Sequence, residues 1–356
     1  MMKKHNFSAG PCILPDSVFQ EASKSILNFN ESNLSLLEIS HRSKGFVDVM
    51  DEAEQLVKEI LNVPSGYSVV FLQGGASMQF LMVCYNLMKT NGKAAYLDTG
   101  TWSSKAIKEA KLFGDVNVVA SSKDKNYNYI PKGFELEKGL DYFHCTSNNT
   151  IFGTQINDFV NVDCPLVCDM SSDIFSRNID ISKFDLIYAG AQKNLGPAGA
   201  TLVIVKDEIL GKTGRTIPSM LDYKTHISKG SMFNTPPVFS IYVSMLTMRW
   251  LKSNGGLDWI QKRNEQKANL IYSTIDNSSI FKGAAEVSDR SKMNATFLLD
   301  DSKLEAEFLK SCDDNGINGI KGHRSIGGFR ASMYNALPIE SVQVLVDIMN
   351  ELEKTK

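Results

Sequence analysis

Short apolar runs alternate with helix-like stretches between residues 67 and 205, and this alternation restricts the fold more than any other feature of the sequence. The strand-like runs are 67–73, 94–98, 116–120, 142–146, 165–169, 186–190 and 201–205. A helix-like stretch at 77–88 separates the first and second runs, and another at 103–114 separates the second and third. Near-continuous apolar strands separated by helices are typical of a parallel sheet covered on both faces. The sequence therefore predicts an α/β fold built on a mostly parallel sheet.

The pattern changes after residue 253. A long helix-like stretch at 257–275 precedes one strand-like run at 295–300, and two more helix-like stretches follow at 303–314 and 338–354. This order predicts a smaller α+β domain at the C-terminal end. A chain of 356 residues is long enough for one large and one small domain. We expect the boundary near residue 255.

Composition and charge exclude several classes of protein. The net charge of −2 provides no basic field for nucleic acid or an anionic membrane. The apolar runs are far shorter than the ~20 residues of a membrane helix, and the N-terminus lacks the apolar segment of a signal peptide. The six cysteines do not form a metal-binding motif, so we expect no metal and reduced thiols in a cytoplasmic protein.

Two adjacent glycines connect the first strand-like run to the helix-like stretch after it. In "LQGGASMQF", Gly74 and Gly75 permit a tight turn, and the amides of Ala76 and Ser77 then point from a helix N-terminus. Helix N-termini attract anions, because their first amides lack partners within the helix and the helix dipole is positive there. A Gly-Gly turn alone is more often only a turn, but this one is suited to a phosphate group.

An acid and a base stand at the ends of two other predicted strands. Asp169 ends the run 165–169, and Lys193 follows the run 186–190. In isolation, Asp169 would be read as a helix N-cap and Lys193 as a solvated loop residue. Ligands of open α/β sheets, however, bind at the carboxyl ends of the strands. With the predicted phosphate site, the two residues indicate pyridoxal phosphate, whose aldehyde forms a Schiff base with a lysine and whose pyridinium nitrogen pairs with a carboxylate.

The sequence resembles the phosphoserine aminotransferase family over nearly the whole chain. The matching stretches are "NFSAGPCILP", "EISHRSK", "LQGGASMQF", "DTGTWS", "CDMSSDIFSR", "YAGAQKNLGPAG", "MFNTPPVFSIY" and "KGHRSIGGFRASMYNALP". The resemblance implies the aspartate-aminotransferase-like fold, with a large domain around a mostly parallel, seven-stranded type of sheet. It also implies that residues 16–255 form this cofactor-binding domain, and that residues 1–15 pack with the small domain, 256–356.

The resemblance also implies roles for cofactor-binding residues. Lys193 forms the Schiff base and moves the proton, Asp169 pairs with the pyridine nitrogen, and Trp102 stacks on the ring. Thr150 bonds the ring hydroxyl. The residues that hold the cofactor phosphate are Ala76, Ser77 and Gln192, with Asn234 and Thr235 from the neighbouring subunit of a homodimer.

The substrate contacts that the resemblance implies are cationic. Arg330 binds the α-carboxylate, for which a planar guanidinium offers two donors at once. The substrate phosphate, or the side-chain carboxylate of glutamate, is received by His323 and Arg324 together with His41 and Arg42 of the partner chain. Some members of the family have Gly-Arg in place of Ala76-Ser77, so the phosphate pocket of this chain has fewer cations than theirs.

The implied reaction is the reversible transamination of 3-phosphohydroxypyruvate with L-glutamate to O-phospho-L-serine and 2-oxoglutarate in serine biosynthesis. Action on 4-phosphohydroxythreonine, in vitamin B6 (pyridoxine) biosynthesis, is a further hypothesis. Two alternatives stand beside this reading. One is another enzyme of the same fold, such as a cysteine desulfurase or an alanine–glyoxylate-type aminotransferase. The other is a non-catalytic scaffold, which would not need Lys193, Asp169 and Arg330 together.

Overall fold

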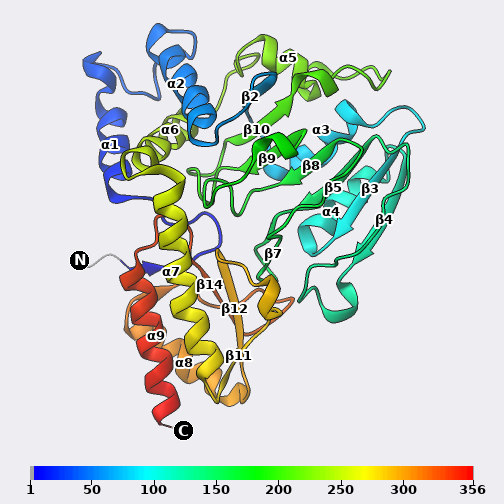
Figure 1. Cartoon of the computed structure of the whole chain (residues 1–356). Helices are drawn as coiled ribbons and strands as arrows, with labels where there is room; N and C mark the ends of the chain where they lie inside the picture. Colours follow the sequence, from blue (N-terminus) through cyan, green and yellow to red (C-terminus); the bar gives the residue numbers. More distant parts are fainter. Residues whose placement is uncertain (1–3, 356) are drawn as a thin grey trace.

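The computed structural model describes residues 4–355 and contains a large, twisted sheet with helices on both faces (Figure 1). Within these residues the sheet has seven strands. In spatial order they are β2 (Tyr67–Leu72), β10 (Thr201–Lys206), β9 (Leu186–Gly190), β8 (Leu166–Asp169), β5 (Tyr142–Thr146), β3 (Lys93–Asp98) and β4 (Asp115–Ser121). Only β10 among them runs antiparallel to its neighbours. The prediction of a mostly parallel sheet is confirmed.

The register of the strands brings several strand ends to one edge of the sheet. Leu72, the last residue of β2, pairs with Thr201, which also pairs with Gly190 at the end of β9. Asp169 at the end of β8 pairs with Thr146 at the end of β5. Residues that follow these strands are therefore neighbours in space, although they are far apart in sequence.

Alternation along the strands produces a different apolar core on each face of the sheet. The face that includes Phe143 and Leu166 packs against α1 (Asp16–Leu27), α2 (Lys44–Ile60) and α6 (Val238–Ser253). The face that includes Tyr142 and Tyr188 packs against α3 (Gly75–Leu87), α4 (Thr101–Ala110) and α5 (Tyr223–Ser228). Both faces are buried, which explains why these strands read as continuous apolar runs.

The C-terminal part has a separate core around an antiparallel sheet of β11 (Phe281–Gly283), β12 (Asn294–Leu299) and β14 (Phe329–Ser332). Its helices are α7 (Gly256–Asn277), α8 (Glu305–Asp314) and α9 (Ile339–Lys354). Strand β1 (His5–Asn6) pairs with β13 (Ile317–Asn318), and Phe7 and Ile13 belong to this second core. A short hairpin of β6 (Asn148–Asn149) and β7 (Thr154–Gln155) lies between the two parts.

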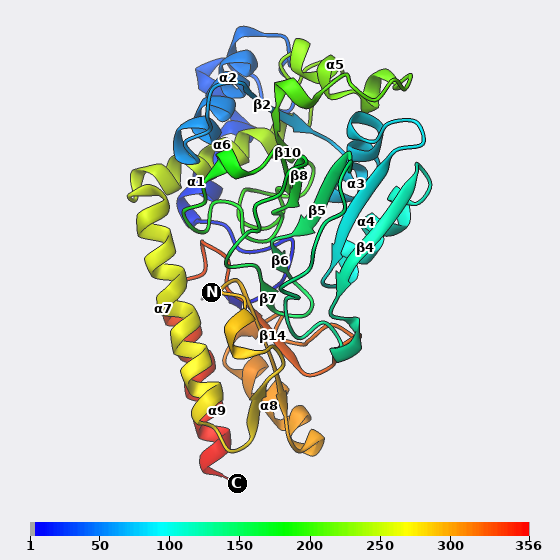
Figure 2. The ribbon, with the colours of Figure 1, turned by 45° about the vertical axis from the view of Figure 1, so that its right-hand side comes forward.

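Helix α7 runs from the large sheet to the end of the C-terminal part, beside α9 (Figure 2). Leu257 and Ile260 near its start belong to the core of the large sheet, and Ala268 and Ile271 belong to the second core. We infer that the domains divide near residue 255 and that residues 4–15 join the small domain, whereas residues 1–3 of that predicted segment lie outside the described residues. Because α7 contributes side chains to both cores, this single helix connects the two parts of the chain.

The predicted elements agree with the structure except at some ends. The strands predicted at 142–146 and 186–190 have the predicted bounds. The helix predicted at 103–114 begins at Thr101 and already ends at Ala110, since a turn follows at 111–113. Within residues 4–355, none of the helices combines the length and the apolar character that crossing a membrane requires.

Candidate active site

Lys193 lies in the loop after β9, at the carboxyl edge of the large sheet, and its side chain is buried. Only 8% of the residue is exposed. Its Nζ donates to Thr150 Oγ1 at 2.6 Å and to Ser172 Oγ at 2.8 Å, and the two hydroxyls are 2.6 Å apart. An amine held by two neutral hydroxyls, in place of a carboxylate, is available for chemistry at this edge.

Burial is the main reason why the Lys193 amine loses its proton easily. Burial lowers the pKa of Lys193 to about 8, because the charged form loses its hydration. The negative charge of Asp169 opposes this shift in pKa, and the positive charge of Arg330 adds to it. A substantial fraction of the amine is therefore neutral, and hence nucleophilic, near physiological pH.

The reactivity of Lys193 should follow this lowered pKa. In the protein freed of cofactor, we expect the acetylation of Lys193 by a small amine-directed reagent, measured by mass spectrometry, to rise with pH and to reach half of its maximum near pH 8. Only the neutral amine reacts, and a solvated lysine becomes half neutral only near pH ~10.4. A midpoint for Lys193 that coincides with that of the exposed lysines would contradict the lowered pKa.

Asp169 is a buried carboxylate at the end of β8, with 5% of the residue exposed. Its Oδ1 accepts a hydrogen bond from the Ser171 amide at 2.9 Å. Burial raises the pKa of Asp169, while the bonds from Ser171 and the charge of Lys193 act in the opposite direction. A carboxylate in this position favours a cationic partner such as a pyridinium N–H, because the partner would stabilise its charge.

Trp102 offers a flat surface beside Lys193. It is the second residue of α4, and its ring centre lies 6.0 Å from the Nζ of Lys193 and 4.5 Å from the Nζ of Lys105. The indole Nε1 is buried and has no hydrogen-bond partner among the described residues. A planar aromatic ring beside Lys193 would find a stacking partner here.

The turn between β2 and α3 has the backbone that the two glycines predict. Gly74 and Gly75 both have positive φ, 89° and 65°. A Cβ on Gly74 would lie 2.5 Å from Cβ of Met78, so this position also requires glycine sterically. Ala76 and Ser77 stand in the first turn of α3, and Ala76 packs against the same apolar cluster as Trp102. The first amides of a helix have no partners within the helix, so this turn is suited to an anion.

Gln192 immediately precedes Lys193 and lies beside the N-terminal segment. Its carbonyl accepts a hydrogen bond from the Cys12 amide at 3.2 Å. The Gln192 Oε1 lies so close to Gly190 that a Cβ built on this glycine would be 2.6 Å from that oxygen. Gln192 therefore stays at the strand end where the phosphate is expected.

Arg330 comes to the site from the C-terminal part. It lies on β14, and its Nη1 donates to the Thr150 carbonyl at 3.4 Å. The Arg330 Nε is buried without a hydrogen-bond partner among the described residues. Burial lowers the pKa of Arg330. A half-buried guanidinium with an unused Nε donor is suited to an anionic group of a ligand.

His323 and Arg324 lie in the loop before β14 and extend this cationic region. Burial lowers the pKa of His323, and the charges of Arg330, Arg324 and Lys105 lower it further. The region therefore combines three cationic side chains around one imidazole. Lys105 is a member that the sequence reasoning missed, although it stands three residues after Trp102.

Four predicted residues are not joined to the site within one chain. His41 and Arg42 precede α2, and no hydrogen bond or ion pair within residues 4–355 connects them to Lys193 or Arg330. Asn234 and Thr235 lie between α5 and α6, where the Thr235 carbonyl accepts from Gln73 Nε2 at 2.7 Å. Any role of these four residues at the site would require a second subunit.

Comparison of the sequence with known proteins identifies its family. Residues 4–345 match the class-V aminotransferase family. The phosphoserine aminotransferase of Flavobacterium johnsoniae is 65% identical over 353 residues, which cover 99% of both chains. The chain belongs to the phosphoserine aminotransferase family.

Solved structures of this family have the same fold. The phosphoserine aminotransferase of Bacillus circulans subsp. alkalophilus is 44% identical, with a TM-score of 0.96 over 99% of both chains. That of Trichomonas vaginalis, solved with pyridoxal phosphate bound, is 35% identical, with a TM-score of 0.94 over 98% of this chain and 100% of that chain. The predicted family and its aspartate-aminotransferase-like fold are confirmed.

Two further residues of this family member escaped the sequence reasoning. Ser172 binds the Lys193 amine, and Asp173 accepts hydrogen bonds from Ser147, from Gln155 Nε2 at 3.1 Å and from Arg177 at 3.1 Å. Both belong to "CDMSSD", a polar run directly after an apolar strand. The place of this run after a predicted strand could have indicated Ser172 and Asp173 as well, but a role was predicted only for Asp169.

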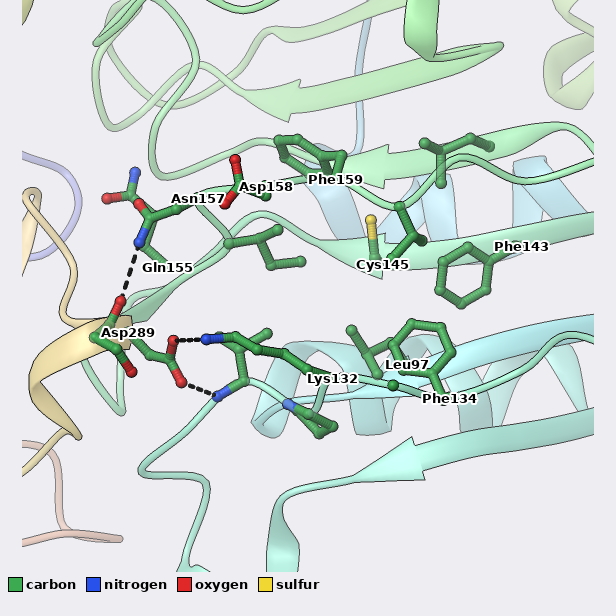
Figure 3. A pocket seen from close by; sticks show the side chains of 17 residues that line it. Leu97, Lys132, Phe134, Phe143, Cys145, Gln155, Asn157, Asp158, Phe159 and Asp289 are labelled. Carbon is green, nitrogen blue, oxygen red and sulfur yellow. Dashed lines mark hydrogen bonds and ion pairs between the residues drawn. The ribbon is translucent and has the colours of Figure 1, made fainter.

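Figure 3 shows a pocket whose lining does not include Lys193. This cavity of ≈ 360 Å³ is lined mainly by apolar side chains, among them Phe134, Phe143 and Phe159, and Lys132 pairs with Asp289 at 2.9 Å beside it. None of the predicted site residues, all of which the structure describes, lines it. The described part of the chain also contains no group of three or more His, Cys, Asp or Glu residues that could hold a metal ion.

Proposed function

We propose that this chain is an enzyme that transaminates 3-phosphohydroxypyruvate with L-glutamate, giving O-phospho-L-serine and 2-oxoglutarate for serine biosynthesis. The observation that carries the proposal is the buried amine of Lys193, which shares one strand edge with the buried carboxylate of Asp169 and with the cationic region of Arg330. Full-length similarity to phosphoserine aminotransferases supports the same reaction.

Pyridoxal phosphate fits the residues that this edge presents. Lys193 supplies an amine for its aldehyde, Asp169 a partner for its ring nitrogen, and Trp102 a surface for its ring. Thr150 would bond the ring hydroxyl. The first turn of α3, at Ala76 and Ser77, and Gln192 would hold the phosphate. When bound, the cofactor supplies an electron sink that stabilises negative charge on the substrate Cα.

The side chains of the protein supply binding and proton transfer. Arg330 binds the α-carboxylate and orients the Cα–H bond toward Lys193. The neutral Lys193 amine accepts the Cα proton and would deliver it to the aldehyde carbon of the bound cofactor, C4′. The hydroxyls of Thr150 and Ser172 keep the Lys193 nitrogen in place. His323 and Arg324 receive the substrate phosphate. A neutral serine would leave these donors without the phosphate that they are arranged to bind, which makes its binding unfavourable.

The remaining predicted contacts require a homodimer, which we include in the proposal. Asn234 and Thr235 of the partner would complete the cofactor phosphate site, and His41 and Arg42 of the partner would complete the substrate site. Exposed leucines near His41 support an interface there. They are Leu27, Leu34 and Leu37, whose exposed fractions are 83%, 48% and 62%. Such large apolar side chains gain from being covered by a second copy.

The alternatives are less well supported. A cysteine desulfurase needs a reactive thiol, but Cys312 in α8 is buried and its pKa is raised to about 12. A non-catalytic scaffold would not need Lys193, Asp169 and Arg330 together at one strand edge. Action on 4-phosphohydroxythreonine stays a hypothesis, and so does a cytoplasmic location, which the six free cysteines favour.

A substrate comparison tests the proposal. We expect O-phospho-L-serine to convert the bound cofactor to its amine form within seconds, as followed by absorbance. L-serine at the same concentration should react at least about 100-fold more slowly, because it leaves the cations unpaired. Conversion by another amino donor but not by phosphoserine would retain the fold and overturn the substrate. Absence of any bound cofactor would favour the non-catalytic scaffold.

A further inference from the structure

Lys267, on α7, is a buried lysine outside the site described above. Its exposed fraction is 0%. Its Nζ donates to the carbonyls of Met333 at 3.0 Å and Tyr334 at 2.8 Å, and no acidic side chain among residues 4–355 pairs with it. Lysine is rarely fully buried without a charged partner, because the loss of hydration is costly. A lysine in this position therefore needs an explanation.

The two carbonyls belong to a segment that leaves β14 directly after the substrate-binding arginine. Arg330 stands on β14, and Met333 and Tyr334 are the third and fourth residues after it. On its other side, the Met333 amide donates to the Met293 carbonyl at 2.7 Å. The Lys267 amine therefore attaches the backbone segment that follows Arg330 to helix α7.

The same segment also contacts the loop of the catalytic lysine. The Asn335 amide donates to Asn194 Oδ1 at 3.0 Å, and Asn194 is the residue after Lys193. Asn335 Nδ2 donates to the Phe175 carbonyl at 2.9 Å. One turn before Lys267 on α7, Asn264 Nδ2 donates to Asn335 Oδ1 at 2.9 Å. Residues 333–335 thus connect α7, β14 and the Lys193 loop.

The hydrogen-bond geometry suits the neutral amine. Two carbonyls accept from Lys267, and a neutral amine has two N–H donors. Burial lowers the pKa of Lys267 to about 7, and the charge of Arg263 lowers it further. Removal of the amine would leave the Met333 carbonyl without a hydrogen-bond partner among the described residues and would take one of two donors from the Tyr334 carbonyl, which also accepts from the Leu337 amide at 2.9 Å. An unpaired buried carbonyl is unfavourable, so we expect the segment to move.

We propose that Lys267 is a positioning residue that, through the Met333 and Tyr334 carbonyls, holds Arg330 at the correct distance from Lys193. The inference rests on the proposed function, since it assumes the roles of Arg330 and Lys193. Lys267 itself touches neither substrate nor cofactor. Figure 2 shows why α7 is suited to this task, because this long helix spans both parts of the chain.

The decisive variant is Lys267→Met, which keeps the length of the side chain and removes its donors. We expect the KM for L-glutamate and for O-phospho-L-serine to rise roughly 10-fold, because loss of the two bonds releases the segment that carries Arg330. The kcat should change less than about 3-fold, and the absorbance of the bound cofactor should stay as in the wild type. Lys267→Gln, which retains two N–H donors on a shorter side chain, should recover part of the lost affinity.

The matched control is Ile271→Ala, four residues further along the same buried face of α7. It should lower the melting temperature without raising KM, since Ile271 makes none of these polar contacts. If Lys267→Met likewise lowers only the melting temperature, or if Lys267→Gln recovers nothing, the positioning role is wrong.

Hydrogen exchange provides a readout that does not depend on turnover. In the holoenzyme without substrate, the backbone amides of residues 329–335 should exchange at least about 10-fold faster in Lys267→Met than in Ile271→Ala. Unchanged exchange would overturn the inference even if the wild type is active. A wild type that does not convert phosphoserine would instead overturn the proposed function, and the exchange result would still decide whether Lys267 holds the segment.

Discussion

Lys193→Ala should lower the rate of transamination by at least about 10⁴-fold. The substitution removes the amine that binds the cofactor aldehyde and carries the Cα proton. It also removes a buried amine with a lowered pKa, so we expect little loss of stability and a folded protein that still holds the cofactor non-covalently. The measurements are the steady-state rate with L-glutamate, the circular dichroism spectrum and the sedimentation coefficient.

The control for this experiment is Lys111→Ala, which removes an exposed lysine after α4. It should leave the rate within about 2-fold of the wild type. A Lys193→Ala protein with ordinary turnover would show that another group binds the aldehyde, and the assignment of Lys193 would be wrong. A variant that is unfolded by circular dichroism would contradict the expectation that this lysine serves chemistry more than stability.

Arg330→Ala should weaken both amino-acid substrates, because both carry an α-carboxylate. Removing one member of a buried charge pair typically costs about 2–5 kcal/mol, so kcat/KM should fall by at least roughly 30-fold for each substrate. Arg330→Lys keeps the charge but loses the two-donor geometry, and it should lie between the wild type and the alanine variant. The measurement is kcat/KM for L-glutamate and for O-phospho-L-serine.

Arg324→Ala is the matched comparison, because Arg324 stands in the loop assigned to the substrate phosphate. This variant should affect the dianionic phosphoserine more strongly than glutamate. An Arg330→Ala effect confined to one substrate would contradict its role at the α-carboxylate. An identical pattern for both variants would mean that the two arginines bind the same group.

The sequence alone determined the large sheet and the positions of its strand-end residues. Strands that are buried on both faces need an apolar side chain at nearly every position, so 142–146 and 186–190 are visible as continuous runs. The motifs around Asp169 and Lys193 were readable for the same local reason, since Asp169 ends one such run and Lys193 comes three residues after another. Motif resemblance then identified the family, and the comparisons confirmed it.

Only the tertiary structure decided which groups meet. Ser172 and Thr150 both reach the Lys193 amine, and Arg330 arrives from a different sheet, yet no periodicity connects these positions. The lowered pKa of Lys193 is likewise a property of its burial. Lys267 is the clearest case, because it ends the polar run "QKRNEQK", 261–267, and this context resembles that of a solvated lysine. Local patterns record how each segment packs, whereas contacts between distant segments, and the loss of water that accompanies them, arise only when the chain is folded.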